Sequence, residues 1–173
     1  MSVNNLILVD LFDNQIGYGE KLDVHKKGLL HRAFSVFIIH NEKMLLQKRN
    51  INKYHSGGLW TNACCSHPRD GEDLELAIYR RLKEELGIST QVNKTFEFVY
   101  RAKFENGITE YEYDHVFVAD YCGTIYPNSD EISETRWISF AALGNELMNN
   151  PDNFTTWFLI SAPKVLSLLN REI

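Results

Sequence analysis

The residues best suited to chemistry gather in a few short stretches of the sequence. Cys65 and His67 follow Trp60-Thr61-Asn62, and residues two apart in an extended chain point to the same side. Two more histidines, His25 and His31, lie upstream. Alone, each has an ordinary explanation, because a free cysteine is most often a buried small hydrophobe and a lone histidine most often a surface residue. Their number is what suggests a site.

A third stretch alternates acids with aromatic residues. In Glu110-Tyr111-Glu112-Tyr113-Asp114 the period is two, so an extended chain places the three carboxylates on one face. Such a face is costly to bury unless a cation or a bound proton compensates the charge. The pattern therefore predicts a divalent metal site.

Gly71 to Gly87 has a helical pattern, with acids at its start and glycine at its end. Its apolar residues form two rows, so we expect the helix to be covered on two sides: Leu74, Ile78, Leu82 and Leu76, Tyr79, Leu86. Arg81 and Glu85 are i,i+4 neighbours at the edge of the apolar face. Ordinary ion pairs on a solvated helix would explain these charges, and a ligand site is the alternative.

The surrounding elements must position these residues. β-Branched and aromatic runs predict strands at Leu6–Val9, Ala33–His40, Met44–Gln47, Thr95–Phe104, Ile108–Tyr121 and Thr135–Ile138. Asn41-Glu42 and Glu105–Gly107 are typical of hairpin turns. Two further helices are predicted at Phe140–Met148 and Thr155–Leu169, the second interrupted near Pro163. Together they predict a mixed α/β sandwich.

Length and composition limit the function. The 173 residues, 44% hydrophobic and 24% charged, are expected to form one globular domain over 1–173. A net charge of −5 argues against nucleic acid or a membrane surface as a partner, so an anionic substrate needs local cations. Met1 to Asn5 lacks the features of a secretion signal, which favours the cytoplasm. Three cysteines, two of them adjacent, do not form a disulfide framework.

The helix resembles the Nudix box, which implies a Nudix-type α/β/α sandwich with mixed sheets. The residues that match in register are Glu72, Arg80, Leu82, Glu84, Glu85, Gly87 and Ile88. Ser66 replaces the first glycine of the motif, and Arg81 replaces an acid. Nudix hydrolases use acids of this helix to hold cations that activate water, whereas an arginine at this position is suited to bind phosphate. The resemblance therefore supports the fold and puts hydrolysis in doubt.

With the other stretches included, nearly the whole chain resembles the type I isopentenyl-diphosphate isomerases. The matching segments are Lys21–His25, His31–Phe34, Trp60–Pro68 and Glu110–Glu112. The resemblance implies the following roles: metal ligands His25, His31, His67, Glu110 and Glu112; a catalytic pair Cys65 and Glu112, with Tyr100 beside it; substrate-binding residues Lys21, Arg49, Lys53, Arg81 and Trp157; and Glu85 as ligand of a second cation. Cys64 is expected to serve packing, and His40, His55 and His115 match no ligand position.

The activity so implied is interconversion of isopentenyl and dimethylallyl diphosphate by adding and removing protons through a carbocation. Thiol and thiolate of Cys65 are both expected near neutral pH. Three imidazoles and two carboxylates suit Mn²⁺, Zn²⁺ or Mg²⁺, and Mg²⁺ is expected to arrive with the diphosphate at Glu85. A monomer or weak homodimer is expected. Two rivals remain, a Nudix hydrolase that releases phosphate and a binding module without turnover.

Overall fold

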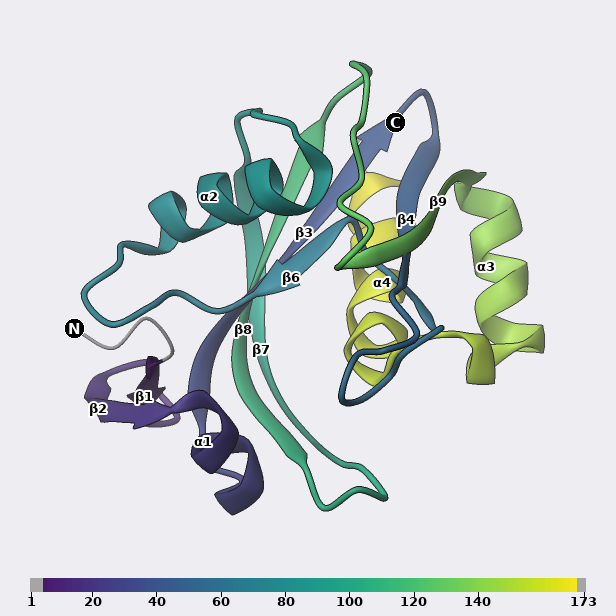
Figure 1. The fold of residues 1–173 in the computed structure, drawn as a ribbon. Helices are drawn as coiled ribbons and strands as arrows, with labels where there is room; N and C mark the ends of the chain where they lie inside the picture. Colours follow the sequence, from purple (N-terminus) through teal and green to yellow (C-terminus); the bar gives the residue numbers. More distant parts are fainter. Residues whose placement is uncertain (1–4, 171–173) are drawn as a thin grey trace.

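The computed structural model describes residues 5–170, so most of the segment Met1–Asn5 lies outside the described residues. Figure 1 shows a mixed sheet with helices on either side. The elements are, in order, β1 (Asn5–Val9), β2 (Gln15–Glu20), α1 (Lys21–Lys27), β3 (His31–His40), β4 (Lys43–Arg49), β5 (Trp60–Thr61), β6 (Cys64–Ser66), α2 (Leu74–Leu86), β7 (Asn93–Lys103), β8 (Thr109–Asp120), β9 (Ile132–Ser139), α3 (Phe140–Asn149), a 3-10 turn (Pro151–Asn153) and α4 (Thr156–Leu169).

The sheet is organised around β3. Parallel β8 occupies one edge of β3, with His31 opposite Glu112, and β7 continues the sheet as a hairpin with β8. Antiparallel β1, β6 and β4 share the other edge in turn, and β6 places Cys65 opposite Ser35. Paired residues share a face, so strands distant in sequence bring their side chains to one surface.

Two hydrophobic cores lie on opposite faces of this sheet. On one face, α2 packs Ile78 and Leu82 against Val36 and Cys64. On the other, α4 packs Trp157 and Phe158 with Phe37 and Val116. This arrangement confirms the predicted mixed α/β/α sandwich (Figure 1). The predicted hairpin turns are also present, and Asn41 and Glu42 both have positive φ, as a tight two-residue turn requires.

Helix α2 begins and ends where its capping residues predict. The side chain of Asp73 accepts a hydrogen bond from the Glu75 backbone N–H, and Gly87 ends the helix with φ +67. The expectation that both apolar rows are covered is wrong in part, because Leu76 is 64% exposed. Helix α2 lies on one face of one sheet, so Ile78, Leu82 and Leu86 are fully buried, whereas Leu74 and Tyr79 are only half-buried.

Helix α4 continues through Pro163, although an interruption was predicted there. Proline removes one helical hydrogen bond, to the carbonyl of Leu159. Pro163 is exposed and Leu159 is only half-buried, so this side of the helix lies near water. The opposite side is fixed in the core by Phe158, Ala162 and Val165.

The hairpin partner β2 and the helix α1 were not predicted. Gly17 and Gly19 interrupt the β pattern of β2, and α1 has only seven residues. Capping makes α1 stable, because the Glu20 side chain accepts from the Asp23 N–H and Gly28 ends the helix with φ +62. Among the described residues, no helix is long and apolar enough to cross a membrane.

Candidate active site

A cavity of about 240 Å³ opens over one end of the sheet. Its walls come from elements far apart in sequence: Cys65 from β6, Tyr100 from β7, Glu110 and Glu112 from β8, and Trp157 from α4. His67 and six cationic residues also line the cavity, the cations being Lys21, Arg49, Lys53, Arg69, Arg80 and Arg81. An anionic ligand would therefore meet concentrated positive charge in an acidic protein.

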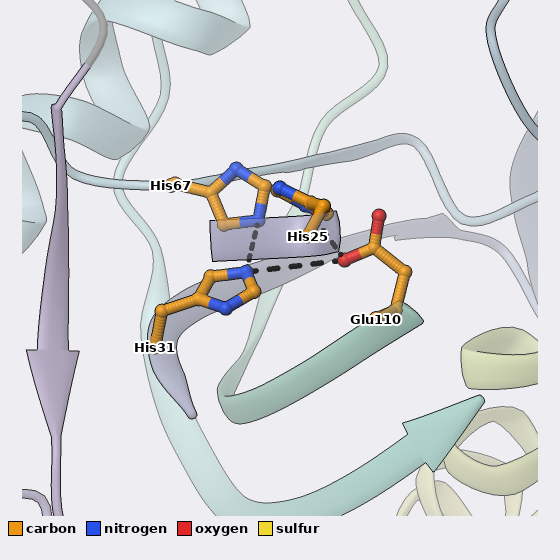
Figure 2. A group of neighbouring side chains, drawn as sticks. All are labelled: His25, His31, His67 and Glu110. Carbon is orange, nitrogen blue, oxygen red and sulfur yellow. Dashed lines mark hydrogen bonds and ion pairs between the residues drawn. The ribbon is translucent and has the colours of Figure 1, made fainter. Parts of the chain in front are cut away.

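Three imidazoles and one carboxylate converge beside this cavity (Figure 2). In His25, His31, His67 and Glu110, one possible ligand atom of each lies within 4.8 Å of all the others. The Nε2 of His25 is 3.1 Å from Glu110 Oε2, and the Nε2 atoms of His31 and His67 are 3.2 Å apart. Glu112 joins the group through Oε1, which is 2.7 Å from His67 Nε2.

Backbone carbonyls orient two of these histidines. His25 Nδ1 is 2.5 Å from the Lys21 carbonyl oxygen one helical turn earlier, and His31 Nδ1 is 2.9 Å from the Leu29 carbonyl oxygen. An Nδ1–H that donates to a carbonyl leaves the lone pair on Nε2, which is how metal-binding histidines are commonly held. Both Nε2 atoms face the centre of the cluster, so the donor set fits a divalent cation.

The pKa shifts of His67 and Glu110 suit metal binding, whereas that of His25 does not: burial would lower the pKa of His25, but the hydrogen bond and charge of Glu110 raise it. Burial lowers the pKa of His67 to about 4, although Glu112 opposes the shift, so its imidazole is neutral near neutral pH. Burial would raise the pKa of Glu110, but hydrogen bonds from His25 and His55 outweigh it and hold the pKa well below its usual range. Neutral imidazole and ionised carboxylate are the forms that bind metals.

Glu112 and Cys65 both reach the cavity, as expected. Tyr100 donates a hydrogen bond of 2.7 Å to Glu112 Oε2, so both oxygens of this carboxylate are held. Burial and Glu110 raise the pKa of Glu112, but hydrogen bonds from His31 and His67 leave it below its usual value. Burial raises the pKa of Cys65 to about 12, against the influence of Arg49. The expectation of a readily available thiolate is therefore wrong, and the thiol dominates.

Cys64 and Cys65 point to opposite faces of the sheet. Cys64 is fully buried in the core beneath α2, as predicted for a packing residue. Cys65 keeps part of its surface on the cavity. Alternation along β6 thus separates two chemically identical side chains.

The four cations named in the sequence all line the cavity, but two are already paired. Lys53 forms an ion pair with Glu131, and Arg81 contacts Glu131 at 3.4 Å and Glu84 at 2.9 Å. Burial lowers the pKa of Lys21, while Glu110 opposes the shift. Glu131 also lines the cavity and was missed, because it lies in a turn without a recognisable pattern.

Glu85, expected to bind a cation that arrives with the diphosphate, is bonded to protein side chains in this structure. It is 3% exposed and does not line the cavity. One oxygen accepts from Arg81 at 2.5 Å, and the other accepts from the Gln47 side chain at 3.1 Å. Arg81 therefore lies between this carboxylate and the cavity.

Trp157 lies in the wall of the cavity with its indole buried and its Nε1–H unpaired. The Arg49 guanidinium lies 5.2 Å from the centre of its ring. Trp157 thus offers an aromatic face next to positive charge, which is the geometry of a cation–π contact.

His55 is a site residue that the sequence did not reveal. It lies in the irregular segment between β4 and β5, where no periodicity predicts its direction. It is 8% exposed, and its Nε2 lies 2.6 Å from Glu110 Oε1. His40 and His115 pair with Asp120 and Asp13 instead and line no part of the cavity.

Asp114 continues the acidic face of β8 but stays beneath the cavity. Ser35 donates to one of its oxygens at 2.8 Å, and the other oxygen is buried without a partner. Burial and the charge of Glu112 raise the pKa of Asp114 well above its usual value. The raised pKa favours the neutral carboxyl of Asp114 next to the ionised pair.

The comparisons with solved structures agree with this architecture. The chain is similar to a protein described as DR0079 from Deinococcus radiodurans, with a TM-score of 0.70 and 18% identity over 84% of this chain and 90% of that one. It is also similar to a MutT protein from Methanosarcina mazei Go1, with a TM-score of 0.64 and 16% identity over 83% and 94%. At these identities the likeness concerns the fold.

The sequence comparisons are more specific. Residues 29–158 match the model of the NUDIX domain. The chain is 49% identical to an isopentenyl-diphosphate Delta-isomerase 2 of Photorhabdus laumondii, over 88% of this chain and 87% of that protein. It is 45% identical to an isopentenyl-diphosphate Delta-isomerase of Photobacterium profundum, over 97% and 95%. The chain belongs to the Nudix family and, within it, to the isopentenyl-diphosphate Delta-isomerases.

Proposed function

We propose that this protein interconverts isopentenyl diphosphate and dimethylallyl diphosphate, and so supplies isoprenoid biosynthesis. The observation that carries the proposal is that Cys65 and Glu112 line one cavity together with a wall of cations. In the sheet, β3 separates β6 from β8, and the register places Cys65 level with Val116, four residues along β8 from Glu112. The two side chains therefore approach the cavity from opposite sides of β3.

The reaction moves a double bond by adding a proton to one end of the alkene and removing another from the carbon on its other side. A tertiary carbocation lies between the two steps. Burial favours the protonated thiol of Cys65, and hydrogen bonds from His31 and His67 favour the ionised carboxylate of Glu112, so the pair can act as one donor and one acceptor. The reverse reaction requires the two groups to exchange roles.

Other residues of the cavity support this chemistry. Tyr100 orients Glu112 through its hydrogen bond to Oε2. The face of Trp157 stabilises a developing cation by about 0.5 to 2 kcal/mol. Lys21, Arg49, Lys53 and Arg81 bind the diphosphate, and the phosphates replace Glu131 as the partner of Lys53.

The residues that would hold a divalent metal are His25, His31, His67, Glu110 and Glu112. We propose Mn²⁺, with Zn²⁺ or Mg²⁺ as alternatives, because this mixed nitrogen and oxygen set suits them. Bound there, the metal would fix Glu112 and tune its acidity. A Mg²⁺ that accompanies the diphosphate requires Glu85 to exchange its contacts with Arg81 and Gln47.

The cytoplasm as location, a monomer or weak homodimer as the active form, and one functional domain over 1–173 belong to the same proposal. The three cysteines fit a reducing compartment.

The proposal is tested by incubating the protein with isopentenyl diphosphate and Mn²⁺ in deuterated water. We expect dimethylallyl diphosphate that carries deuterium, identified by mass spectrometry and NMR, with the diphosphate intact. Release of phosphate or a monophosphate would instead identify a hydrolase. Tight binding without any product would identify a binding module.

A further inference from the structure

The inference concerns His55, a buried histidine beside the cluster. Its Nε2 lies 2.6 Å from Glu110 Oε1, and its side chain is only 4% exposed. It is not one of the four residues whose ligand atoms converge within 4.8 Å. His55 therefore contacts a ligand candidate from outside the ligand set.

The two oxygens of Glu110 have different neighbours. Oε2 faces the cluster, 3.1 Å from His25 Nε2 and 3.9 Å from His31 Nε2. Oε1 faces away from these two and is occupied by His55. A cation in the cluster would thus meet Oε2, while Oε1 stays bonded to an imidazole.

The hydrogen bonds of His55 are consistent with a donor at Nε2. Its Nδ1 lies 3.1 Å from Ser56 Oγ, a hydroxyl that can donate to an unprotonated ring nitrogen. The proton is then on Nε2 and points at the Glu110 carboxylate. An ionised carboxylate on the acceptor side makes this a charge-assisted hydrogen bond.

The ring of His55 is held on several sides. It stacks on Phe104 with a centroid distance of 4.6 Å, and it meets Trp157 edge to face at 5.9 Å. The next residue, Ser56, has φ +52, a conformation that is unfavourable for a residue with a side chain. The segment accepts this backbone strain while it places the imidazole at Glu110.

The same segment is connected to two of the cavity's cations. Arg49 donates to the backbone carbonyl of His55 at 3.3 Å, and Lys53 lies two residues before it. His55 therefore connects the segment that faces the diphosphate with the cluster that would hold the metal.

We propose that His55 is a positioning residue that restrains Glu110, so that this carboxylate binds the metal through Oε2 alone. The inference rests on the proposed metal site. Partners that orient a ligand in this way typically contribute 10- to 100-fold to metal affinity. Such a contribution is independent of the isomerisation itself, so it can be measured without substrate.

The test compares the Mn²⁺ affinity of metal-free protein variants by calorimetric titration. His55→Phe keeps a ring that can stack on Phe104 but removes the donor, and we expect Mn²⁺ affinity to fall about 10- to 100-fold. His55→Gln restores a donor near the position of Nε2, and its affinity should return to within threefold of the unaltered protein. His40→Phe makes the matched change at a histidine outside the cavity and should change nothing.

A second measurement distinguishes an effect on the metal cluster from an effect on the cations that would bind the diphosphate. The carbonyl that Arg49 contacts belongs to the backbone, so His55→Phe should leave the binding of inorganic pyrophosphate to the metal-free protein within twofold. In a Glu110→Gln background, His55→Phe should cost no further Mn²⁺ affinity, because the acceptor charge has gone.

The inference is overturned if His55→Phe binds Mn²⁺ within threefold of the unaltered protein, or if His55→Gln loses as much as His55→Phe. Should His55→Phe unfold, His55→Leu replaces it as the variant without a donor, and the same limits on Mn²⁺ affinity apply. If the unaltered protein binds no Mn²⁺, the proposed metal site fails first. If it binds Mn²⁺ and isomerises while His55→Phe is unaffected, only this inference fails.

Discussion

The adjacent cysteines allow one matched experiment, in which each is replaced by alanine. Cys64 is fully buried under α2, so losing its sulfur leaves a small void that costs about 1 kcal/mol of unfolding free energy. For a chain of this size that lowers Tm by roughly 2 to 4 °C. Cys65 already borders a cavity, so its replacement by alanine should lower the unfolding free energy by less.

For catalysis we expect the opposite order, with the larger loss in Cys65→Ala. Removing a group that transfers a proton lowers kcat by about 10²- to 10⁴-fold, which is about 3 to 5 kcal/mol of barrier. We expect this loss in Cys65→Ala and less than a threefold loss in Cys64→Ala. Initial rates of dimethylallyl diphosphate formation and thermal melts of both variants provide the comparison. Near-full activity in Cys65→Ala, or an inactive but folded Cys64→Ala, would refute the assignment.

Three further predictions concern the neighbouring residues. Tyr100→Phe removes the donor to Glu112 Oε2, a hydrogen bond to a charged group that contributes about 1.5 to 3 kcal/mol. We therefore expect kcat to fall about 10- to 100-fold with the fold intact. Unchanged kcat would show that Glu112 needs no such orientation. A chelator should abolish turnover, and Mn²⁺, Zn²⁺ or Mg²⁺ should restore it to different degrees; full activity after complete metal removal, checked by elemental analysis, contradicts the cluster's role. The raised pKa of Asp114 means that the folded, metal-free protein holds a proton that the unfolded chain releases above its ordinary pKa near 4. The contribution of Asp114 to stability should therefore fall as pH rises above that value, and Asp114→Asn should remove this contribution from the pH dependence measured in urea titrations. An equal pH dependence in both proteins would show that Asp114 ionises freely.

The regular elements were predictable because their patterns are local. Helix α2 carries its start and stop signals in Asp73 and Gly87, and the long strands β3 and β8 carry continuous apolar or alternating runs. The ends of these elements differed by a few residues, as hydrogen-bonded pairing extends strands beyond their apolar part. His31 is an example, since its pairing with Glu112 places it in β3.

The parts that could not be predicted depend on tertiary contacts. His55 lies in a segment without periodicity, so only the folded chain reveals that its ring points at Glu110. The pKa of Cys65 depends on burial by neighbours from other strands, which spacing along the sequence does not report. The position of Glu85 behind Arg81 has the same origin.

The position of Arg81 explains how a Nudix helix can serve a reaction other than hydrolysis. Arg81 stands where the Nudix box has an acid, and it binds Glu84 and Glu85 of the same helix as well as Glu131. As long as Arg81 keeps these contacts, the acids are neutralised by its guanidinium and are poorly placed to hold a cation that activates water at the phosphates. The imidazoles and carboxylates that fit a metal come instead from α1, β3, β8 and the segment after β6. Under the proposed function, the cationic wall of the cavity would hold the diphosphate unreacted, while Cys65 and Glu112 would face the hydrocarbon end.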